Sequence, residues 1–289
     1  MNVLNGFLAD LYSVVPFTGR WILSYTAELA AAWRLFATLF FELTDKNKKN
    51  VMPALRAGVP KLLLLLVYHP VQLILTSVAL VLHAIANLIN RTIFSSVERG
   101  LNEKEKQYLY AIFSDNLQFD KIRIQFGGVK EYLKISPQAV GHEIFLRKKW
   151  GTQMYNDDLS LSSSGMRLLG HEVCHVWQSQ HMGARYIGDS LITQISEALG
   201  RRLNIHLSHG YNVVPVLRDH TSYENCNVEQ QAVIAELIGA SCAAVDTKVL
   251  TKAQFCKVSG IALNDKEFAG VTRAHRYLQQ SAPKVPRGL

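Results

Sequence analysis

Two histidines and a glutamate within five residues have the types and spacing that metal-assisted hydrolysis needs. The stretch LLGHEVCHVWQ (168–178) contains His171 and His175, four positions apart, with Glu172 directly after the first. On a helix, residues four apart share one face, so both imidazoles can reach a single ion. Glu172 stands where it could take a proton from a water on that ion. We therefore interpret the two histidines as metal ligands and Glu172 as a general base.

The alternative is an amphipathic helix that carries this HExxH pattern by chance. Three local features argue against chance: Gly170 is uncharged, the variable positions Val173 and Cys174 carry no charge, and the flanks form an apolar helical stripe without proline. This context is the one that the motif requires. Helical geometry turns Cys174 away from the histidine face, so we expect it to be a small buried residue and not a ligand.

A third ligand must come from another segment, because a catalytic zinc site has three protein ligands and one open position. The strongest candidate is Glu229, in the first turn of a helix that the capping residues Asn227 and Gln230 predict. Glu236 follows two turns later on the same face, where it could hold a histidine N–H. Small Ala232 between them would let the two helices lie close together. Weaker candidates remain open, namely Asp219, Glu224, His206, His209 and His220.

Peptide hydrolysis also requires a group that stabilises the oxyanion formed during the reaction. Tyr211, His220 and Tyr223 stand in the connection before Glu229 and are all candidates. The sequence does not choose among them, and each could equally be a packing or solvent-exposed residue.

The segment from residue 99 to residue 289 has the pattern of a globular α+β domain. Asn102 and Glu105 form a capping box that predicts a helix over 101–114. Alternating apolar residues predict strands in a small antiparallel sheet. Helices are expected on both sides of a long irregular connection at 209–226. The expected strands are 121–126, 131–135 and 142–146, and the later helices are 164–180, 186–206, 227–250 and 265–280.

Residues 1–98 form a separate apolar region that we expect to be helical. A helix pair over 1–45 is predicted to break at 16–19. The stretch 62–89 contains no fixed charge and is long enough to span a bilayer, although Pro70 would kink it. Three interpretations stay open: a tilted transmembrane helix, a helix buried against residues 1–45, or a helix that inserts on delivery or assembly.

The composition narrows the class of partner. The chain has 289 residues, 48% of them hydrophobic, and a net charge of +8. That charge would suit an anionic membrane or a nucleic acid. The basic residues are scattered, however, and no recognition motif is present, so we expect no nucleic-acid partner. The four cysteines have no CxxC spacing and the N-terminus lacks the features of a secretory signal, which indicates synthesis in a reducing compartment.

The motif and the later stretch YENCNVEQQAVIAE (223–236) together resemble a family of zinc metallopeptidases found beside bacterial contractile injection and type VI secretion systems. These proteins are often labelled Vgr-related or injection-system core-domain proteins. The resemblance covers about residues 100–240, including the opening at 101–124, and does not extend to 1–95. The matching residues are His171, Glu172, His175, Val176, Gln178, Asn227, Glu229, Gln230, Gln231 and Ala232.

This resemblance implies a zincin-like metallopeptidase domain that binds Zn²⁺ through His171, His175 and Glu229, with Glu172 as the base. Related gluzincin peptidases often place an aspartate after the third ligand, where this chain has Glu236, seven residues on. The family members are poorly characterised as enzymes, so the resemblance supports the site more than the substrate.

The expected function is therefore hydrolysis of a protein or peptide by zinc-activated water. The chain would be an effector or toxin, made in the bacterial cytoplasm and exported by an injection system, with a secretion-system or immunity protein as partner. Residues 62–89 would contact a membrane. The alternative is a non-catalytic, zinc-braced module that binds a membrane or a secretion-system component. An integral-membrane protease is disfavoured, because 179–226 is charged and lacks an apolar run of spanning length.

Overall fold

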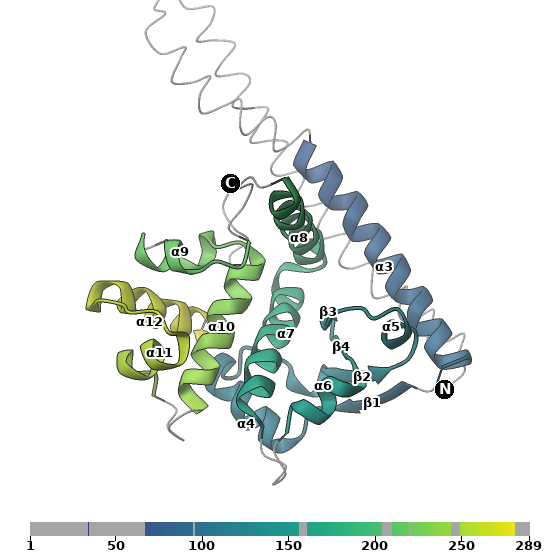
Figure 1. Cartoon of the computed structure of the whole chain (residues 1–289), viewed down its shortest axis with the longest axis horizontal. Coiled ribbons are helices and arrows are strands. Elements are labelled where there is room, and N and C mark those ends of the chain that lie inside the picture. The colour runs from purple at the N-terminus through teal and green to yellow at the C-terminus, as the bar shows by residue number, and fades with distance from the viewer. Residues whose placement is uncertain are drawn as a thin grey trace, which may run out of the picture.

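The computed structural model of this chain describes residue 34 and residues 67–94, 96–155, 161–203, 210–219, 221–243 and 249–280. Within these ranges the protein is α+β, mostly helical, with one small mixed sheet to one side of the helices α7 (Ser163–Met182) and α10 (Val228–Ala243) (Figure 1). The helix pair predicted over 1–45 lies outside the described residues except for Arg34, which is helical. The predicted boundary at residues 98 and 99 falls inside a strand of the sheet.

The sheet has four strands in the order β1-β2-β4-β3, and its central pair is parallel. The expectation of an antiparallel sheet is therefore wrong for β2 and β4, whereas β1–β2 and β3–β4 are antiparallel. The physical reason is the path of the chain. After β2 the chain crosses to the far edge, forms β3 there, and returns as β4 in the gap beside β2. The strands are β1 (Ser96–Gly100), β2 (Arg123–Gly127), β3 (Gln138–Val140) and β4 (Glu143–Leu146).

The strand predicted at 131–135 is also wrong, because the short helix α5 (Val129–Tyr132) begins just before it. Gly127 and Gly128 have φ angles of 81° and 75°, which turn the chain out of β2. The Val129 N–H then donates to the Asn90 side chain at 2.7 Å. A Cβ atom on Gly128 would lie 2.3 Å from that same side chain. A contact with a distant helix thus sets the local structure here.

That distant helix is α3 (His69–Thr92), which lies along one side of the molecule in Figure 1. It packs against α8 (Arg185–Leu203) and against α5. The predicted capping box is confirmed at the start of α4 (Glu103–Phe113), where Asn102 and Glu105 bond each other's backbone amides. Glu105 also forms an ion pair with Arg99 of β1, at 2.7 Å, which fastens this helix to the sheet.

The centre of the domain is a pair of packed helices, α7 (Ser163–Met182) and α10 (Val228–Ala243), side by side in Figure 1. Gly170 permits their close approach: a Cβ atom there would lie 3.3 Å from the Cα of Glu236 and 2.9 Å from the Tyr108 hydroxyl. Ala232 of α10 is fully buried, as the predicted close packing requires. The core continues from these helices into α4 and the sheet.

The remaining helices complete the shell around this pair. Within the expected irregular connection, the described residues include the short helix α9 (Val214–Arg218) and the 3-10 turn η4 (Tyr223–Asn225). The last predicted helix is confirmed as α12 (Asp265–Gln280), whereas α11 (Lys252–Ser259) was not predicted. In Figure 1 these C-terminal helices lie on the opposite side of α10 from α3. The other short elements are η3 (Phe119–Lys121) and α6 (Lys148–Gln153).

Candidate metal centre

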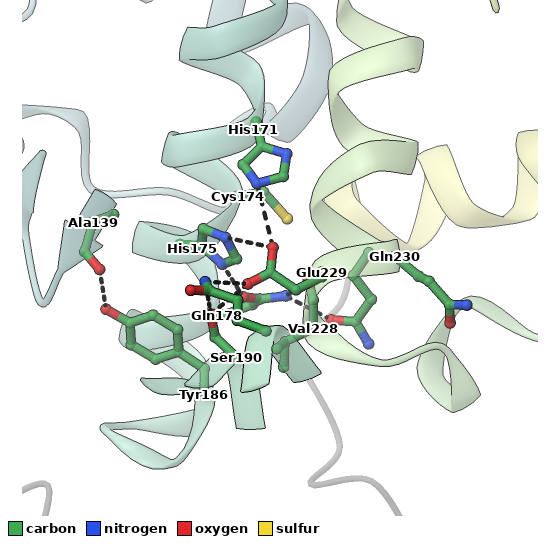
Figure 2. Close-up of polar contacts among 12 residues, drawn as sticks. Ala139, His171, Cys174, His175, Gln178, Tyr186, Ser190, Val228, Glu229 and Gln230 are labelled. Atoms are coloured by element: carbon green, nitrogen blue, oxygen red, sulfur yellow. Dashed lines mark hydrogen bonds and ion pairs between the residues drawn. The ribbon is translucent and has the colours of Figure 1, made fainter. Parts of the chain in front are cut away.

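Three side chains from two helices converge on one point. His171 and His175 stand one turn apart on α7, and Glu229 comes from the first turn of α10. Their Nε2 atoms lie 3.4 Å and 3.5 Å from Oε2 of Glu229, and the three ligand atoms all lie within 4.8 Å of one another. Figure 2 shows the imidazoles and the carboxylate turned toward each other. This buried cluster could hold a metal ion.

The spacing of these donor atoms matches the size of a metal ion. Tetrahedral zinc binds nitrogen and oxygen at roughly 2.0–2.2 Å, which separates neighbouring ligand atoms by about 3.3–3.6 Å. The two distances from Oε2 of Glu229 to the histidine nitrogens fall in this range. They are also long for well-aligned hydrogen bonds, and Oε2 of Glu229 accepts none from the described residues although it is buried. A cation would give this oxygen the partner it lacks.

Each histidine is oriented through its other ring nitrogen. Nδ1 of His171 faces Oε2 of Glu236 at 3.4 Å, and Nδ1 of His175 faces Oε1 of Gln178 at 2.8 Å. A nitrogen that faces an acceptor carries the ring proton, which leaves the Nε2 lone pair for a cation. Glu236 therefore occupies the supporting position predicted for it.

Gln178 is itself held in place, and it connects the two helices. Its Nε2 donates to the backbone oxygen of Val228 at 2.9 Å and to Oε1 of Gln231 at 3.0 Å. Gln231 in turn donates to the backbone oxygens of Tyr223 and Cys226. The orientation of the His175 ring thus depends on the start of α10, which also carries Glu229.

The third ligand is fixed from a different direction. Oε1 of Glu229 accepts hydrogen bonds from the Ser190 hydroxyl and, at 3.3 Å, from Nε2 of Gln194, both on α8. Its side chain is 1% exposed. Burial alone would raise the pKa of Glu229, but His175 and His171 in their protonated form outweigh burial and lower it, and a bound cation would supply the positive charge in their place. The group is therefore a carboxylate anion with one oxygen anchored and the other directed at the histidines.

Glu172 lies beside the cluster without belonging to it. Its side chain is buried and lines the same cavity as the three ligands. Oε2 of Glu172 is also buried and has no hydrogen-bond partner among the described residues. Burial raises the pKa of this carboxyl above its ordinary value. A carboxyl with an uncommitted oxygen and a raised pKa has the properties of a general base.

The cluster opens into a cavity of about 740 Å³. Helix α3 forms one wall of this cavity, and β3, α5, the segment after α5, and α8 form others. Tyr186 supports the wall that β3 forms, because its hydroxyl donates to the Ala139 oxygen and accepts from the Gly141 N–H. Its ring stacks on His175, with the ring centroids 5.9 Å apart. An ion bound by the three side chains would have one side facing this space.

The other predicted site residues separate into four groups. Tyr211 lines the cavity, and its ring stacks on His171 at 6.3 Å. Tyr223 is buried in the core, where its hydroxyl donates to the Gln231 backbone, so it does not line the cavity. Cys174 is buried beside Tyr223, as expected. Asp219 and Glu224 are exposed and outside the cluster, and His206, His209 and His220 lie outside the described residues.

Sequence reasoning assigned no role to Gln178, Ser190, Gln194 and Tyr186. Gln178 could have been found, because it lies three residues after His175 on the same helical face. The α8 residues gave no signal, because ordinary serine and glutamine side chains on a helix have no distinctive spacing. No family model, curated protein or solved structure matches this chain.

Replacing Glu236 should weaken metal binding. We expect Glu236→Ala to lower the affinity for a divalent metal by about 10–100-fold, because the His171 ring loses the carboxylate that orients it. Glu236→Gln should recover part of this loss, since an amide oxygen can still accept from Nδ1. Competition with a chromophoric chelator measures both, with exposed Glu224→Ala as the control. Equal affinity in all variants would exclude a supporting role for Glu236.

Proposed function

We propose that this protein is a zinc-dependent peptidase that uses Glu172 as its general base. One observation carries the proposal: His171, His175 and Glu229 direct three donor atoms at one point, beside a buried carboxyl with a free oxygen, at the end of a cavity. Two imidazoles with one carboxylate form a ligand set that catalytic zinc uses. When bound, zinc would activate a water and polarise the substrate carbonyl.

The chain's own residues would transfer the proton from the attacking water to the leaving group. Glu172 would accept it from the attacking water and later pass it to the leaving amine. Of the two candidates that the structure describes, Tyr211 and Tyr223, it is Tyr211 that lines the cavity, so we assign to it the hydrogen bond that stabilises the oxyanion. Burial and the nearby charge of Glu229 raise the pKa of Tyr211, which keeps its hydroxyl protonated.

The walls of the cavity fit an extended peptide. β3 is one of the two edge strands of the sheet, and its residues Gln138, Ala139 and Val140 all line the cavity. An extended segment can add to such an edge through main-chain hydrogen bonds. The lining on α3 is mainly apolar, so apolar substrate side chains would be favoured there. Delivery by a bacterial injection system remains part of this proposal, supported by the resemblance of 168–178 and 223–236.

The geometry favours an enzyme over a zinc-braced module. A structural zinc site is closed by four protein ligands. Here the described cluster has three, and its remaining side faces the cavity. Glu172 would also have no role in a brace, although burying an unsatisfied carboxyl is costly.

The test is metal-dependent cleavage by the full chain, purified in a mild detergent. We expect about one zinc per chain by elemental analysis and cleavage of members of a mixed peptide library. Chelation should stop cleavage while the circular dichroism spectrum persists, and added zinc should restore it. Zinc binding without any cleavage, together with unfolding on chelation, would instead establish the brace.

A further inference from the structure

Helix α3 turns its polar face toward the protein and its apolar face outward, which is the reverse of a surface helix in a water-soluble domain. Its side chains that face the protein are mostly polar, whereas a soluble surface helix turns its apolar side inward. The buried polar residues recur at helical spacing along one face. The buried residues of α3 are His69, Gln72, Thr76, Ala84, Asn87 and Asn90.

The opposite face of α3 is apolar and exposed. At 100° per residue its large side chains fall within an arc about 100° wide, centred opposite the polar face. Their exposed fractions range from 43% for Val71 and Ile85 to 61% for Ile74. We call this surface the outer face of α3; it consists of Val71, Ile74, Val78, Val81, Leu82 and Ile85 of the helix, together with Val67 just before it.

The composition of α3 is that of a lipid-contacting helix. The segment His69–Asn90 is long and apolar enough to cross a membrane, with a mean hydropathy of 1.9, and is the one such helix among the described residues. A core helix of a soluble protein passes the same test when it is mostly buried. Here 22% of the apolar window is buried, so the protein's own described residues do not account for its hydropathy.

The contacts of α3 argue against a spanning orientation. Near its start, the Tyr68 hydroxyl and Gln72 both bond Asp189 of α8. Near its end, Asn87 donates to Glu143 at 2.7 Å. The helix is thus attached to charged groups of the domain at both ends, and crossing the bilayer would carry those groups into hydrocarbon. An orientation in the plane of the interface avoids that cost.

An aromatic and basic surface adjoins the C-terminal end of α3. Tyr132 and Leu133 are 76% and 60% exposed, and the Tyr132 ring lies 6.3 Å from Phe94, just beyond the helix. Lys134, Lys148 and Lys149 are exposed in the neighbouring segments. Tyrosine and lysine are residues that hold proteins at the headgroup level, and lysine favours anionic lipids. The residue types and the positive charge of this surface therefore match an anionic bilayer surface.

The outer face and the catalytic cavity share a wall. Val78, Leu82 and Ile85 are exposed on the outer face and also line the cavity that contains His171 and Glu229. Whatever covers the outer face therefore lies at the rim of the cavity.

We propose that α3 lies in the plane of an anionic membrane, with its outer face in the acyl chains, so that the cavity opens at the bilayer surface. Resting on the proposed peptidase function, this assigns as substrate a peptide segment that lies on, or emerges from, the membrane. Residues 1–66 of this chain, or a second copy, are the competing occupants of the outer face.

Lipid contact is testable without any activity. In the full chain, Val81→Cys would provide the attachment site for a polarity-sensitive NBD fluorophore. Cys256 is partly exposed and is replaced by serine, whereas Cys174, Cys226 and Cys242 are buried and should not react with the label. Vesicles of phosphatidylglycerol and phosphatidylethanolamine should shift its emission to the blue, and brominated acyl chains should quench it at least twofold. A label at Thr272→Cys, exposed on α12, should show neither effect. Blue emission without quenching would mean that protein covers the outer face, and unchanged emission would mean water; either result overturns the proposal.

The substrate class is tested with one peptide that the chain cleaves in the absence of vesicles, presented either free or tethered to a vesicle lipid. Tethering should raise the cleavage rate by about tenfold or more, through the higher effective concentration at the membrane. Ile74→Lys with Val81→Lys should remove this gain without slowing cleavage of the free peptide, since neither residue lines the cavity. Equal rates for both forms overturn the substrate assignment. Absence of any cleavage counts against the peptidase function instead, while the quenching result stands separately.

Discussion

Glu172→Gln should lower peptide cleavage by about 10²–10⁴-fold, the usual contribution of a general base. The substitution keeps the size of a buried side chain and removes its ability to accept a proton. Oε2 of Glu172 has no hydrogen-bond partner among the described residues, so the amide breaks no observed bond at that atom. The metal content should stay at the wild-type level, because Glu172 is not one of the three clustered ligands.

Initial rates on a single peptide, with zinc measured in the same sample, would check this result. Glu103→Gln is a suitable control, because the Glu103 side chain is 81% exposed and does not line the cavity. A Glu172→Gln variant that cleaves at the wild-type rate would exclude Glu172 as the base. A variant that loses both its zinc and its activity would mean that Glu172 supports the ligands.

The part of the site that could be predicted from the sequence is the part that helical periodicity determines. His171 and His175 share a face because they are four apart, and Glu229 and Glu236 do so because they are seven apart. The capping pair Asn227 and Gln230 fixed the start of the second helix, and both of its hydrogen bonds are present. Periodicity and capping depend only on residues within one helix, so they can be recognised in the sequence without knowledge of tertiary contacts.

The features that could not be predicted depend on contacts between distant segments. Residues 131–135 alternate like a strand, but the side chain of Asn90 binds the Val129 amide and a helical turn forms instead. Ser190 and Gln194 anchor Glu229 only because α8 packs beside α10. The hydropathy of 62–89 likewise left the orientation of α3 open, since it does not state which face meets the protein.

Zinc should stabilise the metal-free protein strongly, and Glu229→Gln should remove most of that effect. At about 1,000 times Kd, a ligand that binds the folded state adds about 4 kcal/mol. With an unfolding entropy of about 2.1 cal/mol/K per residue, that raises the Tm of a 289-residue chain by roughly 7 °C. The binding free energy of zinc at sites with four ligands is about 10–16 kcal/mol, which is about 3–4 kcal/mol for each ligand. Losing one ligand should therefore raise Kd by roughly 10²–10³-fold.

At the same zinc concentration the Glu229→Gln variant would then gain about 0.4–1.4 kcal/mol, which limits its Tm shift to a few degrees. The amide keeps the oxygen that Ser190 and Gln194 bond, so the variant should fold. Exposed Glu224→Gln should show the full wild-type shift. Because Tm reports binding and not turnover, this measurement tests the convergence of His171, His175 and Glu229 on one ion even if no substrate has been found. A full shift in Glu229→Gln would place the ion elsewhere and remove the basis for a catalytic site at this position.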